Sequence, residues 1–120
     1  MSAQIKHECG IALIRLLKPL EYYREKYGTS FYGLNKMYLL MEKQHNRGQD
    51  GAGLANVKFD VAPGNRYISR HRSNSNKPIQ DIFDHIYGGI KNRVKERANG
   101  DESVLEDPNW IKKNAPFSGE

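Results

Sequence analysis

The chain has 120 residues, which suffices for one domain with a modest core. Apolar residues make up 38% and charged residues 28% of it, and no stretch approaches the ~18 apolar residues of a membrane span. The first eight residues lack the apolar run of a secretory signal, so we expect a cytoplasmic protein without a membrane partner. The formal charge of +5 is scattered, densest at 66–72 and 91–97, so we do not expect a nucleic-acid partner.

The N-terminal half predicts one strand and two helices. Residues 9–17, "CGIALIRLL", form a nearly continuous apolar run that favours a buried strand. Residues 19–28 predict a short helix that ends at Gly28. Residues 31–44 predict a second helix, with Ser30 as its N-cap. Its apolar stripe recurs at three- and four-residue spacing, at Leu34, Met37, Tyr38 and Met41.

The C-terminal half predicts a hairpin followed by a long helix. Residues 54–59 and 66–72 read as two strands joined by the turn "VAPGN". Residues 78–97 predict an amphipathic helix, kinked or broken at Gly88-Gly89 because mid-helix glycines are unfavourable. Its apolar face comprises Ile79, Ile82, Phe83, Ile86, Ile90 and Val94. A further short helix is expected after Asp107-Pro108, and the element order predicts an α+β fold.

Cys9 is the only cysteine, and it stands between a charged octapeptide and the apolar run. A thiol becomes a strong nucleophile only as its thiolate, which normally requires a nearby base. If residues 1–8 were removed, the new α-amine of Cys9, with a pKa of about 7.7–8.0, would be such a base. The alternative is a small buried residue at the start of a strand, and the sequence up to this point leaves both interpretations open.

A second polar cluster lies at residues 41–55, "MEKQHNRGQDGAGLA", directly after the second predicted helix. Its three glycines permit close backbone approach to a ligand, and Arg47 could bind a carboxylate or phosphate through two hydrogen bonds. The alternative is a polar loop whose glycines only form turns. The four histidines, His7, His45, His71 and His85, do not show metal-ligand spacing, so we expect no metal site.

Together, "CGIALI" and "QHNRGQDGAG" resemble the class II glutamine amidotransferases, and among them the amidophosphoribosyltransferases of purine synthesis. That family begins its mature chain with Cys-Gly and an apolar strand, and its first long helix ends in a Gln-His-Arg-Gly-Gln-Asp/Glu motif. The resemblance covers about residues 1–60. It implies the N-terminal portion of an Ntn-hydrolase αββα glutaminase domain, incomplete in 120 residues.

The resemblance also implies roles for individual residues. Cys9 would attack the carboxamide of glutamine, with its α-amine as base, after loss of a propeptide at 1–8. Arg47 and Gly48 would belong to the wall of the glutamine pocket. Asn46 is an insertion relative to the family motif, which puts the loop geometry in doubt.

Other features of the family have no match in this sequence. These are the strand arginine that holds the α-carboxylate of glutamine, the Asn-Gly pair of the oxyanion hole and an aspartate for the α-amine. A phosphoribosyltransferase domain, where Mg²⁺ would be expected, is also missing, so the chain itself calls for no cofactor. We therefore expect residues 9–120 to be an inactive part of a longer enzyme that needs its C-terminal domain and could form a homo-oligomer.

A different class of function fits the same residues. A small basic module that binds RNA, DNA or another protein would need Cys9 only as a buried residue.

Overall fold

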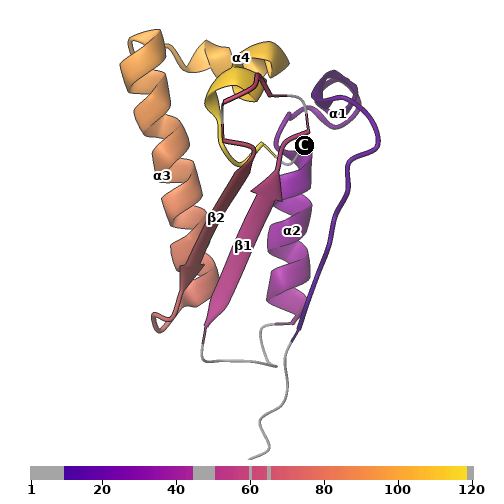
Figure 1. The fold of residues 1–120 in the computed structure, drawn as a ribbon, viewed down its shortest axis with the longest axis vertical. Coiled ribbons are helices and arrows are strands. Elements are labelled where there is room, and N and C mark those ends of the chain that lie inside the picture. The colour runs from indigo at the N-terminus through magenta and orange to yellow at the C-terminus, as the bar shows by residue number, and fades with distance from the viewer. Residues whose placement is uncertain (1–9, 45–50, 60, 65, 119–120) are drawn as a thin grey trace, which may run out of the picture.

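A computed structural model describes residues 10–44, 51–59, 61–64 and 66–118 of the chain. In these residues the elements follow the order helix, helix, hairpin, helix, without the strand that was expected first, and the combination of helices with an antiparallel hairpin confirms the α+β class. They are α1 (Leu20–Tyr27), α2 (Tyr32–Lys43), β1 (Ala52–Val57), β2 (Ile68–Ser73), α3 (Pro78–Ala98), the short 3₁₀ helix η1 (Glu102–Glu106) and α4 (Pro108–Asn114). Figure 1 shows the hairpin between α2 and α3, with α4 across one end of it.

The core is built around one face of α3. Its six predicted apolar residues are all buried, with exposed fractions between 0% and 6%. Residues from every other helix and from β1 pack against this stripe or beside it in one cluster: Leu20, Leu34, Leu54, Ile111 and Phe117 are buried there, with Met37 and Tyr38 at its margin. Spacing of three and four residues places such side chains on one helix face, and burial of that face stabilises the fold.

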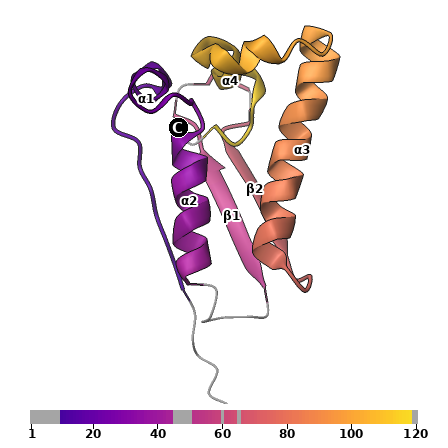
Figure 2. The same ribbon diagram turned by 180° about the vertical axis from the view of Figure 1, so that it is seen from behind.

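The hairpin covers α3 and α2 with only one of its faces. β1 and β2 pair antiparallel, with Leu54 opposite His71 and Ala55 opposite Arg70. Along β1 the buried residues are Leu54 and Asn56, while the alternate residues are exposed or half-buried. Figures 1 and 2 show α2 and α3 on either side of the strands, with residues 10–17 running along the outer side of α2.

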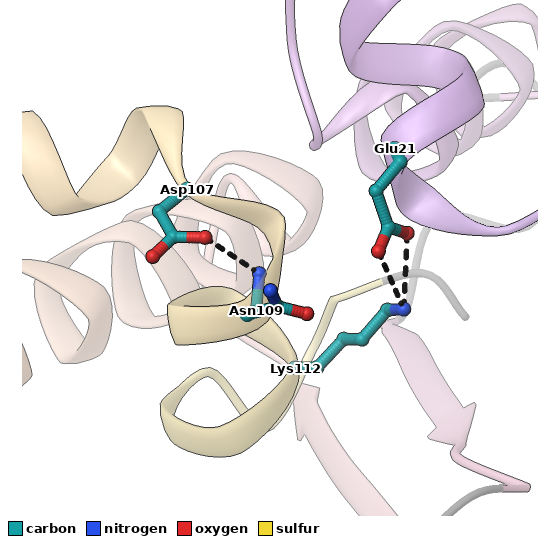
Figure 3. A network of polar contacts seen from close by, with 4 residues as sticks. All are labelled: Glu21, Asp107, Asn109 and Lys112. Atoms are coloured by element: carbon teal, nitrogen blue, oxygen red, sulfur yellow. Dashed lines mark hydrogen bonds and ion pairs between the residues drawn. The ribbon is translucent and has the colours of Figure 1, made fainter.

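The C-terminal segment ties the ends of the elements together. Asp107 caps α4 by accepting a hydrogen bond from the backbone N–H of Asn109 at 3.0 Å. Lys112 of α4 pairs with Glu21 of α1, with 3.0 Å between Nζ and Oε1 (Figure 3). The carbonyl oxygen of Lys112 accepts from Lys58 Nζ at 2.7 Å, so α4 joins α1 to the end of the hairpin.

The predicted strand at 9–17 is wrong for the residues that the structure describes. Residues 10–17 are not assigned to a strand. Ala12, Ile14 and Leu16 are half-buried, whereas the alternate residues Ile11 and Leu13 are 91% and 89% exposed. The segment therefore has the alternation of a strand, but no described backbone segment pairs with it, and apolar composition alone could not supply that partner.

Several local predictions are corrected in detail. Ser30 does not cap α2: its hydroxyl is buried without a partner, and Thr29 Oγ1 instead accepts from the N–H of Phe31 at 3.0 Å. The predicted break at Gly88-Gly89 does not occur, because α3 is continuous through both glycines. The buried stripe on either side of them outweighs their unfavourable helix propensity. The strands begin and end up to two residues away from the predicted bounds.

We predict opposite outcomes for the same substitution at two isoleucines. Ile82→Ala should lower the free energy of unfolding by about 2–5 kcal/mol, because it leaves a cavity at a fully buried position. Ile11→Ala should change it by less than about 0.5 kcal/mol, because that side chain is exposed. Urea denaturation measures both. A large loss for Ile11→Ala would mean that residues 10–17 are a buried strand after all.

The pair between Glu21 and Lys112 should make a small, pH-dependent contribution to stability. A hydrogen bond from its own backbone N–H and another from Lys112 lower the pKa of Glu21 below 4.5. The contribution is therefore present above about pH 4.5 and is lost as the pH falls through the lowered pKa. Glu21→Gln should cost well under 1 kcal/mol at pH 7, because both groups are partly exposed, and should cost less at pH 3 than at pH 7. Thermal melts of both proteins at the two pH values test this, and an equal cost at both would contradict it.

Candidate active site

The three predicted site residues, Cys9, Arg47 and Gly48, lie outside the described residues. Their neighbours in the chain are described, however: Gly10 is bonded to Cys9, and residues 45–50 are bracketed by Gln44 and Gly51. The positions of these flanking residues show whether the fold brings the two motifs toward each other.

Gln44 joins the two motifs directly. It follows the last residue of α2 and is also the first residue of the "QHNRGQDGAG" motif. Its side-chain Nε2 donates a hydrogen bond to the carbonyl oxygen of Ile11 at 3.1 Å. The end of α2 is thus fixed against the residues that follow Cys9, two segments more than 30 positions apart in the chain.

Gly10 is required at this contact. A Cβ built at Gly10 would lie 2.8 Å from both Cβ and Cδ of Gln44 and would also collide with its Oε1. Since real Cβ atoms are essentially never that close to another heavy atom, a side chain at position 10 would displace Gln44. The close approach of Gln44 therefore requires a glycine after Cys9, whether or not a substrate binds there.

A cavity of about 540 Å³ opens beside this contact. One wall is the segment 10–14, the other is 51–55 at the start of β1, and Met37, Met41 and Gln44 of the α2 region form the floor. A second hollow of about 380 Å³ continues it along residues 13–16 and 54–57. The two make one groove between the N-terminal segment and β1, and the described ends of both motifs line it.

The described lining of the 540 Å³ cavity is apolar and has no ionisable side chain. Besides backbone groups, the amide of Gln44 is the polar group that it offers. A nucleophile beside this lining would therefore need its own base, or a cation from outside the cavity, to become a thiolate.

Within the described residues, acidic, histidine and cysteine side chains do not cluster in a way that could hold a metal ion. Described helices are also too short or too polar to cross a membrane.

Sequence reasoning singled out the motif but missed the role of Gln44 within it. The signal was present, since a polar residue at the C-terminal end of a predicted helix has a side chain free to bond outside it. Its partner, Ile11, could be identified only from the fold.

Comparison with family models, with curated proteins and with solved structures finds no significant match to this chain. The likeness to amidotransferases therefore depends on the two motifs and on where their flanking residues lie.

We predict that Gly10→Ala acts through Gln44. The substitution should lower the free energy of unfolding by about 1 kcal/mol, the value of one hydrogen bond, because Gln44 must release Ile11. In a chain that already carries Gln44→Gly, the same change should cost close to nothing. A double-mutant cycle by urea denaturation measures this coupling, and equal costs in both backgrounds would show that Gly10 and Gln44 are not in contact.

Proposed function

We propose that this chain is the glutamine-hydrolysing part of a class II amidotransferase of the amidophosphoribosyltransferase type. The observation that carries the proposal is the contact between Gly10–Ile11 and Gln44, which brings the ends of the Cys-Gly and Gln-rich motifs together at one groove. Two motifs of a shared active site must meet in space, and a chance pair of motifs has no reason to do so.

In the proposed reaction the Cys9 thiolate attacks the side-chain carbonyl carbon of glutamine. The thiol proton passes to the α-amine of Cys9, which then protonates the leaving nitrogen as the C–N bond breaks. Ammonia departs and a γ-glutamyl thioester remains on Cys9. Water, deprotonated by the same amine, hydrolyses the thioester and releases glutamate.

This chemistry requires that residues 1–8 be removed. While they remain, the nitrogen of Cys9 belongs to an amide and cannot accept a proton. The 540 Å³ cavity adds to this requirement, because its described lining has no histidine or lysine that could replace the amine. Arg47 and Gly48, which lie in the sequence between Gln44 and Gly51, are the proposed contacts to glutamine.

Turnover by this chain alone should be very slow. The oxyanion-hole and carboxylate-binding groups of the family lack counterparts in its sequence, and one oxyanion donor is worth about 10²–10³ in rate. We propose that the C-terminal domain of a longer cytoplasmic enzyme supplies or positions them. The chain itself calls for no cofactor.

We predict that a glutamine-like diazoketone labels Cys9 only in the processed chain. The chain beginning at Cys9 should react with 6-diazo-5-oxo-norleucine at least about 100-fold faster than residues 1–120, the usual value of a positioned general base. Mass spectrometry of the intact and digested protein gives the rate and the labelled residue.

A cysteine control identifies the labelled atom. Cys9→Ser should abolish the adduct. Protection by free glutamine is not required of this chain, because the carboxylate-binding groups of the family lack counterparts in its sequence. Equal rates with and without residues 1–8 would contradict the proposed function.

A further inference from the structure

The face of the hairpin turned away from α2 and α3 is open. Its residues alternate with buried residues on the β1 side, where they are Gly53, Ala55, Val57 and Phe59, and with half-buried residues along β2, on whose side they are Arg66, Ile68, Arg70 and Arg72. All eight are exposed, Phe59 to 73%. We call these eight residues the open sheet face. They are uncovered because the core lies entirely on the opposite face of the two strands (Figures 1 and 2).

Strand alternation gathers three arginines into a row along this face. Arg70 and Arg72 are two residues apart on β2, about 6.8 Å. Arg66 stands two residues before β2, next to Tyr67, whose carbonyl oxygen still accepts from the N–H of Lys58 at 2.8 Å, and extended spacing from Arg66 to Arg72 would give about 20 Å. None of the three has a described hydrogen bond or ion-pair partner. The described residues between 51 and 73 include no aspartate or glutamate, and Asp60 lies outside them.

Small residues leave a flat lane beside the row. In the register of the hairpin, Gly53 lies opposite Arg72 and Ala55 opposite Arg70. A Cβ at Gly53 would approach Cβ of Arg72 to 3.3 Å, so glycine keeps the backbone there accessible. A hollow of about 670 Å³ lies over residues 53–55 and 70–72. A ligand could thus lie against the backbone of β1 with its charges toward β2.

An exposed aromatic ring stands at one end of the face. The guanidinium of Arg15 lies 5.6 Å from the ring centroid of Phe59, yet most of the Phe59 side chain remains exposed to solvent. A planar ring flanked by arginine is the kind of surface on which unpaired bases stack.

From these features we propose that the open sheet face binds single-stranded nucleic acid. A row about 20 Å long exceeds what one phosphate or carboxylate would occupy, and it fits a chain of phosphates. Phe59 can stack only on bases that are not already paired. Since α2 and α3 cover the other face, the hairpin is also not free to enter the groove of a duplex. This surface does not depend on the proposed glutaminase chemistry.

The test uses the full chain and a fluorescein-labelled oligouridylate of about 12 nucleotides, within the site sizes of such surfaces. Fluorescence anisotropy gives the dissociation constant between about 50 and 200 mM salt. Arg70→Ala with Arg72→Ala should reduce the slope of log K against log salt by about 1.4, and should weaken binding about 25-fold at about 0.1 M salt. Phe59→Ala should weaken binding about fivefold or more without changing the slope.

Matched variants separate the row from net charge. Lys91→Ala with Lys95→Ala removes the same charge from exposed positions on α3 and should leave the slope unchanged. Arg70→Lys with Arg72→Lys should retain the slope, which also guards against misfolding of the alanine pair. Three results would overturn the proposal: equal losses from the lysine and arginine pairs, displacement by a duplex as effective as by the single strand, or binding of polyglutamate that matches the oligonucleotide while Phe59→Ala has no effect.

Discussion

The apolar stripe of α3 is the constraint on which the other elements depend. It is the longest continuous buried surface in the described chain, and α2, β1 and α4 reach the core by contacting it or its neighbours. The edge-to-face contact between Tyr38 of α2 and Phe83 of α3, with ring centroids 5.2 Å apart, is one such junction. A single stripe can cover only one face of a hairpin, so the fold has one buried layer and one open face.

This one-sided packing explains where the exposed apolar residues lie. Residues 10–17 contact the α2 side through Ala12, Ile14 and Leu16 and turn Ile11, Leu13 and Leu17 outward, where they are 77–91% exposed. Contiguous apolar exposure of this kind is uncommon in a monomer and marks a surface that gains free energy when covered. The groove between this segment and β1 has the same origin, because the core that holds both walls does not extend between them.

β1 connects the two functional proposals. Gly53 and Ala55 line the groove that leads to the Cys-Gly motif and also form the lane beside Arg70 and Arg72. Small residues serve both purposes for one reason: where a side chain is short, backbone groups remain reachable. Ligands on the two sides of β1 would lie close together, so binding of one would be expected to affect the other through steric and charge effects.

The sequence by itself determined the elements that depend on local spacing. The 3.6-residue period fixed the buried face of α3 residue by residue, Gly28 ended α1 in the left-handed conformation with φ of +82°, and the Pro-Gly turn marked the hairpin. These features follow from backbone preferences and from burial along one helix or strand. The two motifs could also be recognised from the sequence, because a motif is defined by residue types and their order and not by the fold.

Only the tertiary structure decided which surfaces meet. It left 10–17 unpaired within the described residues, since a strand needs a neighbour that composition cannot provide. It kept α3 continuous through Gly88-Gly89, because burial on both sides outweighs local propensity. It brought Gln44 to Ile11 and turned the scattered charges of 66–72 into one row, since both depend on which face of each element the core leaves free.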